Sequence, residues 1–222
     1  MKKILKIYNA FADKLKIGAI VFGNVKVESS IAELNSQIDD LATQLQSKFP
    51  TPAAANTLFS DMRHIYRQLG IDPTKTRPSS EALIRRALQR KTIYLINSIV
   101  DICNYCSIYF GLSIGLYDVD KICGEKIEIR LGQNGEGYAG IGKQYVNLEA
   151  RIALVDRQGP FGNPSSDSDR TKITLESKRV MFIIFAPFDY EQSKMHDHLD
   201  FVETTVKKYH NCQIEFKQII TG

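Results

Sequence analysis

Hydrophobic residues recur along much of the chain at steps of three and four, which is the spacing of one face of an α-helix. The clearest case follows Ser29 and Ser30, either of which could cap the helix, and continues to about Lys48. Pro50 and Pro52 end this helix because proline cannot continue the backbone hydrogen bonds. The same spacing predicts four more helices, at residues 53–69, 79–91, 97–110 and 192–209.

Other stretches alternate hydrophobic and polar residues or are hydrophobic throughout, and both patterns are typical of β-strands. Residues 180–188 are continuously apolar, which predicts a central strand buried on both faces. The glycine-rich residues 132–142 lie between predicted strands and lack the lysine of a phosphate-binding loop, so we expect a β-turn or a hairpin. Further strands are predicted at residues 2–8, 17–27, 124–132, 151–159 and 213–219. Intermixed helices and strands predict an α+β fold, a mixed sheet with helices packed on it.

A polar stripe interrupts the hydrophobic pattern of the helix at residues 97–110. Asn97, Asp101 and Asn104 recur at steps of four and three, so they lie on one side of the helix. Short polar side chains are mediocre helix formers, and three of them in line need partners or a ligand. Gly111 ends the helix. The extended segment that follows carries Asp118 and Asp120 on one side, with Lys121 beside them.

Asp101 lies in the middle of this helix, where an unpaired carboxylate facing the core would be costly. Two explanations are open. Asp101 could pair with Arg77 or Arg170 and brace a pocket, or it could face an open pocket and bind the amino group of a ligand. Arg77 is available for the first role because it precedes Pro78, which holds it in an extended conformation.

Length and composition are those of an ordinary globular chain. The 222 residues, 43% hydrophobic and 24% charged, predict a single domain over residues 1–222, with residues 1–70 packed on residues 71–222. No run of 18 apolar residues is present, so we expect no membrane span. The net charge of +4 permits a nucleic-acid partner without requiring one.

The four cysteines fit a reducing environment, and we therefore expect a cytoplasmic protein. Cys103 and Cys106 form a CxxC pair, but they lie on the apolar face of a predicted helix and no second pair is present to complete a zinc site. Core packing is the expected role of both thiols. The four histidines belong to no catalytic or metal-binding motif, so the sequence predicts neither a metal nor a cofactor.

Residues 100–124, VDICNYCSIYFGLSIGLYDVDKICG, resemble the B3/B4 module of the bacterial phenylalanyl-tRNA synthetase beta subunit. RPSSEALIRR at residues 77–86 and SDRTKIT at residues 168–174 extend the resemblance to residues 75–190 with order and spacing kept. The residues that match the family's central pattern are Val100, Asp101, Asn104, Tyr105, Gly111, Asp118, Asp120, Lys121 and Gly124.

The resemblance implies the sheet-and-helix architecture of that module and its editing site, which accepts the mischarged 3′ end of a tRNA and hydrolyses the ester. The family has a histidine where this chain has Gly115. The chain is too short for the synthetase's catalytic and anticodon modules, so it is not an amino-acid ligase. The predicted substrate-binding residues are Arg77, Asn97, Asp101, Asn104, Asp118, Asp120, Lys121, Ser168, Asp169, Arg170 and Thr171.

Two hypotheses about function follow. The first is a free-standing deacylase that binds the aminoacylated 3′ end of tRNA and hydrolyses a wrongly attached amino acid. An ester on tRNA is intrinsically activated, so a positioned water and donors to the oxyanion could suffice without a strong general base. The second is a binding module that holds RNA, an amino acid or a nucleotide without turnover. The partner is accordingly a tRNA or a small amino-acid-like ligand, and the sequence leaves the oligomeric state open.

Overall fold

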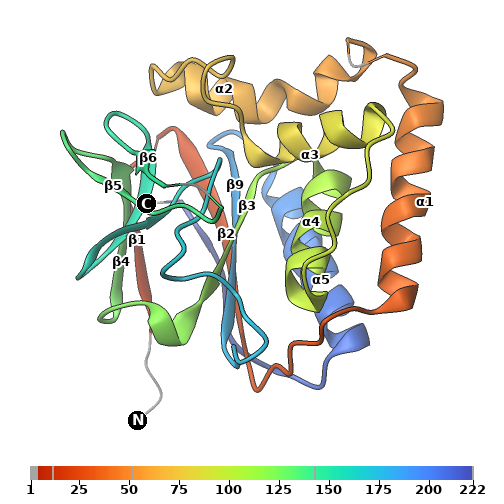
Figure 1. Ribbon diagram of the computed structural model, residues 1–222. Helices are drawn as coiled ribbons and strands as arrows, with labels where there is room; N and C mark the ends of the chain where they lie inside the picture. The colour runs from red at the N-terminus through yellow and green to blue at the C-terminus, as the bar shows by residue number, and fades with distance from the viewer. Residues whose placement is uncertain (1–4, 12, 52, 143, 222) are drawn as a thin grey trace.

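Two four-stranded sheets and a layer of helices make up the computed structural model, which describes residues 5–11, 13–51, 53–142 and 144–221 (Figure 1). We call the sheet next to the helices the central sheet. Its strands, in spatial order, are β10 (Gln213–Ile220), β2 (Leu15–Gly23), β9 (Val180–Pro187) and β3 (Ile114–Asp118). We call the other the outer sheet. Its strands are β1 (Lys6–Asn9), β4 (Lys126–Leu131), β7 (Ile152–Asp156) and β8 (Gly159–Gly162).

Neighbouring strands are antiparallel except for β1 and β4, which are parallel, so the outer sheet is mixed. Every residue of β2 and of β9 is buried, because one face of the central sheet packs on the helices and the other faces the outer sheet. Edge-to-face aromatic contact between Tyr117 on β3 and Phe161 on β8 joins the two sheets. The predicted α+β class and the doubly buried strand at residues 180–188 are confirmed.

The helices form the third layer. α4 (Ser98–Phe110) packs on β3 and on α5 (Gln192–Tyr209), and α5 packs on β2. α1 (Ala32–Lys48) lies outside them against α3 and α4. α2 (Ser60–Gln68) and α3 (Ser79–Leu88) cross one end of the central sheet, at the top of Figure 1. The helices and strands before residue 71 therefore pack on, or pair with, elements from the rest of the chain.

Three local predictions differ from the structure. The helix expected at residues 53–69 is divided into a 3₁₀-helix, η1 (Ala54–Phe59), and α2, since Asn56 and Thr57 are weak helix formers. α1 begins after Ile31 without a side-chain cap, and Ser30 accepts a hydrogen bond from Asn35 instead. The chain after Asp118 turns into a 3₁₀-helix, η2 (Val119–Lys121), rather than continuing as a strand.

The glycine-rich residues 132–142 form the first arm of a small antiparallel hairpin, as predicted. Its strands are β5 (Gly137–Tyr138) and β6 (Val146–Asn147). A small hydrophobic cluster lies beneath it: Tyr138, Val146, Leu148, Ala153 and Val155. The turn before β5 uses Gly135 at φ +76°, a left-handed conformation that favours glycine. The hairpin therefore has a structural explanation and needs no bound phosphate.

Candidate functional site

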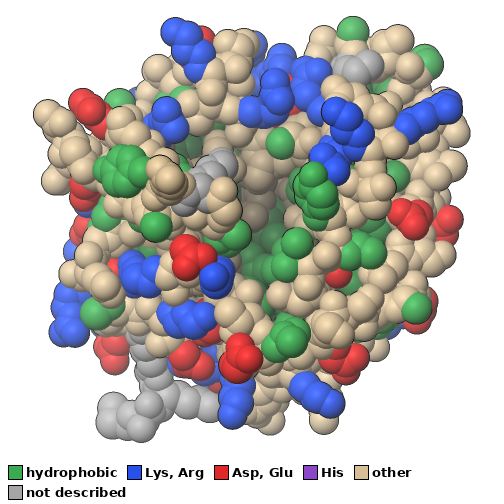
Figure 2. All heavy atoms as spheres, viewed as in Figure 1, with side chains coloured by type: hydrophobic (Ala, Val, Ile, Leu, Met, Phe, Trp, Pro, Cys, Tyr) green, Lys and Arg blue, Asp and Glu red, His purple; other side chains and the backbone are tan. Residues whose placement is uncertain are grey.

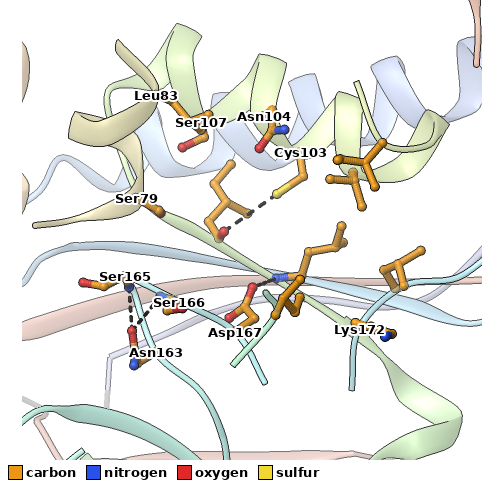
Figure 3. A pocket seen from close by; sticks show the side chains of 16 residues that line it. Ser79, Leu83, Cys103, Asn104, Ser107, Asn163, Ser165, Ser166, Asp167 and Lys172 are labelled. Carbon is orange, nitrogen blue, oxygen red and sulfur yellow. Dashed lines mark hydrogen bonds between the residues drawn. The ribbon is translucent and has the colours of Figure 1, made fainter. Parts of the chain in front are cut away.

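A cavity of about 450 Å³ opens on the face of the molecule shown in Figure 2, between the helical layer and the loop that follows β8. Its interior is visibly apolar, and Lys and Arg side chains gather along its upper rim in that view. The volume is in the range of sites for small molecules or single residues of a larger substrate. The wall is built by the start of α3, one side of α4, β3 and residues 163–173 (Figure 3).

Apolar side chains cover most of the cavity wall. Four come from α3, α4 and the segment between them: Leu83, Ile96, Val100 and Cys103. Four come from β3 and the loops opposite: Ile114, Leu116, Ile141 and Ile173. Such a wall suits a hydrophobic or aromatic side chain of a ligand, because binding would remove that side chain from water.

Asp167 supplies a carboxyl group to this apolar surface. Its Oδ2 accepts a hydrogen bond from the Leu116 amide at 3.4 Å, and its Oδ1 is buried. Burial raises the pKa of Asp167 from 3.8 to about 7, although the Tyr117 hydroxyl and the amides of Leu116 and Asn163 oppose the rise. Neither Asp167 Oδ1 nor the Tyr117 hydroxyl has a partner in standard hydrogen-bond geometry within the described part of the chain. Asp167 is therefore a carboxyl group that changes charge near neutral pH beside an open cavity.

The loop that carries Asp167 is held in place by its own hydrogen bonds. Asn163 Oδ1 accepts from the amides of Ser165 at 2.6 Å and Ser166 at 2.8 Å (Figure 3). The Pro164 carbonyl accepts from the amide of Ser79, the first residue of α3, at 2.9 Å. These contacts use the side chain of Asn163 as a turn-forming residue. They fix the carboxyl group relative to α3 before any ligand arrives.

Four further polar residues line the cavity: Ser79, Asn104, Ser107 and Lys172 (Figure 3). Ser107 Oγ already donates to the Leu112 carbonyl at 2.8 Å, and Lys172 Nζ donates to Asp169 at 2.7 Å. The Asn104 amide has no hydrogen-bond partner among the described residues, so its donors and acceptor can meet a ligand.

Asn104 is the member of the predicted set that lines the cavity. Asn97 instead caps α4, where its side chain accepts from the Val100 amide at 3.1 Å. Asp101 is fully buried and accepts from the Ile96 amide at 2.8 Å. Both residues hold the segment that enters α4, and their contact with a ligand stays a prediction.

The arginine partners expected for Asp101 lie elsewhere. Arg170 forms an ion pair with the buried carboxylate of Asp156 at 2.8 Å, and Arg77 lies 3.9 Å from Glu81. No cation in the described ranges forms an ion pair with Asp101. Burial raises the pKa of Asp101, while the amides of Ile96 and Asn97 partly oppose that rise.

The remaining predicted residues hold the loop and the turn after β3. Asp118 accepts from Ser177 Oγ at 2.7 Å and lies 3.5 Å from Lys121 Nζ, whereas Asp120 pairs with Arg179. The 3₁₀ turn of η2 directs the two carboxylates to different partners. Within the 168–171 segment, Ser168 and Thr171 are buried and share a hydrogen bond, and Asp169 pairs with Lys172 at the surface.

Gly115 stands where the family's pattern has a histidine, and it faces away from the cavity. Ile114 and Leu116 on either side line the wall, so strand alternation turns residue 115 to the opposite face. A Cβ at this position would meet the ring and hydroxyl of Tyr117. In this chain, Tyr117 fills the space that a side chain at position 115 would enter.

Sequence reasoning missed Asp167, although it named its neighbours on the C-terminal side. The available signal was the alternation SDSD at residues 166–169. Adjacent residues of an extended segment point to opposite sides. Because Ser168 is buried in the protein, Asp167 points to the other side of the loop. CxxC packing was predicted correctly, since Cys103 and Cys106 are both buried, although Cys103 also reaches the cavity wall.

The described residues contain neither a metal-binding cluster nor a membrane-spanning helix. No group of three or more His, Cys, Asp or Glu side chains in them is arranged to hold a metal ion. None of their helices is both long enough and apolar enough to cross a membrane.

The amino-acid sequence matches a known domain family. The family model for the B3/4 domain matches residues 61–200, and the chain belongs to this family. Among curated proteins, the chain is similar to phenylalanine–tRNA ligase beta subunits. The subunit of Streptococcus pyogenes serotype M28 is 31% identical over 160 residues, which cover 69% of this chain and 19% of that protein. The subunit of Protochlamydia amoebophila is 27% identical over 103 residues, covering 42% and 13%.

A solved structure agrees with the fold. An N-terminal fragment of the phenylalanyl-tRNA synthetase beta subunit from Pyrococcus horikoshii superposes with a TM-score of 0.51 at 14% identity. The match covers 98% of this chain and 54% of that one. The chain thus spans only a small part of the curated relatives that it matches, and the resemblance between the structures concerns the fold.

Proposed function

We propose that this chain binds the aminoacylated 3′ end of a tRNA in the cavity and hydrolyses the ester of a wrongly attached amino acid. Membership of the B3/4 family supports the tRNA context. The observation that carries the proposal is the position of Asp167, a carboxyl group with a pKa of about 7 at a largely apolar wall. An aminoacyl group combines a hydrophobic side chain with an ammonium group and an ester. The apolar wall suits the side chain, and Asp167 and Asn104 are polar groups for the other two parts.

Asp167 has the properties of a general base for ester hydrolysis. A base works best when its pKa is near the operating pH, because it is then both ionised and able to take a proton. In the proposed reaction, ionised Asp167 accepts a proton from a water that attacks the ester carbonyl. The ester C–O bond then breaks, and the ribose oxygen takes the proton back from Asp167 to leave as the tRNA hydroxyl. The amino acid product loses its carboxyl proton to solvent and departs as a carboxylate. The unpartnered Asn104 amide is placed to hydrogen-bond the aminoacyl group.

A panel of mischarged tRNAs tests the proposal directly. The rate of deacylation should rise with pH through about 7, following ionisation of Asp167. Asp167→Asn should lose at least about 100-fold in rate, the usual contribution of general acid–base catalysis. Asp169→Asn is a matched control: this carboxylate lies two residues away, but it is exposed and pairs with Lys172. Equal rates for Asp167→Asn and wild type would refute the catalytic role.

A non-catalytic binding module is the second candidate. It is favoured by the absence of histidine from the cavity lining formed by the described residues. In that case Asp167 would pair with the ammonium group of an amino-acid-like ligand and keep it without turnover. Wild type would then deacylate none of the mischarged tRNAs, while Asp167→Asn would weaken binding of the free amino acid.

A further inference from the structure

The segment between α3 and α4 exposes an unusual group of large side chains beside the cavity. Tyr94 is 65% exposed, Leu95 45% and Ile96 59%. The Arg86 guanidinium carbon lies 3.8 Å from the centroid of the Tyr94 ring, and Arg86 Nε donates to the Thr92 carbonyl at 2.5 Å. The arginine therefore covers one face of the tyrosine ring and leaves much of the ring open to solvent. A cation stacked on an aromatic ring holds that ring in a defined orientation.

This segment is continuous with the cavity wall and is anchored to the fold. Ile96 and Leu83 line the cavity, and Leu83 lies one helical turn from Arg86 on α3. The Ile96 amide donates to the buried Asp101, and the Ser98 amide donates to the Glu28 carbonyl at 2.8 Å. Figure 2 shows basic side chains along this upper rim. Tyr94 is two residues from Ile96 in this segment, so its exposed ring lies near the cavity.

Positive charge accompanies the exposed ring. Arg86, Arg90 and Lys91 form no ion pair with any described residue, in contrast to Arg85, which is engaged by Glu81. Arg90 and Lys91 are exposed, and Arg90 has a positive φ of 56° at the end of α3. Cations that form no ion pair with a described residue, beside an open aromatic face, suit a polyanion that also carries flat rings.

We infer that Arg86, Arg90, Lys91 and Tyr94 form a stacking platform for the last nucleotides of a single-stranded RNA 3′ end, with a base on the open face of Tyr94. The inference rests on the proposed function, in which the terminal aminoacyl group occupies the cavity. Bases stack on aromatic side chains without sequence preference, and arginine and lysine track the phosphates. An acidic peptide would use the cations but not the open ring face, which favours RNA.

Binding of an uncharged RNA hairpin with a single-stranded 3′ CCA end tests the platform without involving the aminoacyl group. Tyr94→Ala should weaken binding about fivefold or more, the lower end of what a base–aromatic stack contributes. Tyr94→Phe keeps the ring and should bind within about twofold of wild type. Replacing both Arg90 and Lys91 with alanine should weaken binding and lower the slope of log affinity against log salt by about 1.4.

Tyr8→Ala is the matched control. Tyr8 is also exposed and carries a cation, Lys126, 5.2 Å from its ring centroid, but it lies on β1 and does not line the cavity. Equal affinities of wild type and Tyr94→Ala, or equal affinity for a blunt hairpin without the overhang, would overturn the platform. If wild type deacylates a mischarged tRNA and Tyr94→Ala does so with the same KM, the platform is overturned and the proposed function stands. Tyr94-dependent RNA binding without deacylation of any mischarged tRNA would support the platform and refute the proposed deacylase.

Discussion

At the scale of single residues, two aspartates show how position decides chemistry. Asp167 and Asp169 are two residues apart in one loop, but only Asp167 lines the cavity. Asp169 lies at the surface with Lys172 beside it. Burial raises the pKa of Asp167 to about 7, so its proton is retained in the folded protein at pH values where an unfolded chain would release it. The raised pKa of Asp167 therefore affects both the stability of the fold and the ability of this carboxyl group to transfer a proton near neutral pH.

This linkage predicts that Asp167→Asn is more stable than wild type at pH 8 and that this advantage is smaller at pH 5. Because the folded pKa lies above the unfolded value of 3.8, wild type loses stability as pH rises from about 4 through about 7. Asparagine carries no charge and avoids this loss, which has an upper limit of about 4 kcal/mol. Thermal melting of both proteins at the two pH values measures the difference. A lower melting temperature for the variant at pH 8 would contradict the raised pKa.

Asp101 leads to a different expectation. It forms no ion pair with a described residue, and the Ile96 amide donates a hydrogen bond to its carboxylate. Asparagine can accept the same bond, so Asp101→Asn should change the free energy of unfolding by less than about 1 kcal/mol, whereas Asp101→Ala should lose about 1–3 kcal/mol. Urea unfolding of the two variants compares them. A loss of about 3 kcal/mol or more in Asp101→Asn would instead indicate a buried ion pair, the bracing role that the sequence first suggested.

At the scale of elements, a single buried carboxylate joins α2 to α3. Glu81 on α3 is almost fully buried and receives Arg63 from α2 and Arg85 from its own helix, both at 2.7 Å. Burial raises the pKa of Glu81, but the hydrogen bonds from the two arginines outweigh it, so the pKa lies below its usual value. Because α3 begins at the cavity with Ser79, this cluster also sets the position of one cavity wall.

Glu81→Gln should therefore destabilise the protein by about 3 kcal/mol at pH 7, since it leaves two arginines without their shared partner. The wild-type contribution is present above the unfolded pKa of glutamate and is lost as pH falls below it. Urea unfolding at pH 7 gives the difference. Glu128→Gln is the control, because Glu128 pairs with Lys126 at the surface and such pairs contribute little. Equal losses in the two variants would show that the α2–α3 cluster is not a special source of stability.

At the scale of the whole molecule, the layers were more predictable than the cavity. Periodicity placed α1, α4, α5 and β9 because each presents one continuous hydrophobic face or run to the core. Asn104 was found by the same reasoning, since its position on α4 follows from helical spacing. Asp167 could not be found in this way, because the cavity brings together α3, α4, β3 and a loop that are distant in sequence. Tertiary packing, rather than local pattern, determines which loop residue meets them.

The charge distribution predicts weak and salt-sensitive RNA binding. The net charge is only +4, and three cations lie on the stacking platform. Each phosphate contact with a single strand contributes about −0.7 to the slope of log affinity against log salt, so three contacts give a slope of about −2. A titration of labelled tRNA over a range of salt concentrations measures the slope. Tight binding that does not change with salt would show that contacts other than phosphate pairing dominate.

The order of strands in the central sheet has a consequence for synthesis of the protein. β10, the last strand of the chain, pairs with β2, one of the first, so the sheet is finished only when residues 213–220 have been made. Until then one edge of β2 has no partner strand, although all nine residues of β2 are buried in the finished fold. Exposed hydrophobic edges promote aggregation during folding. A nascent chain arrested just before β10 should consequently recruit chaperones, and release of the final strand should end that dependence.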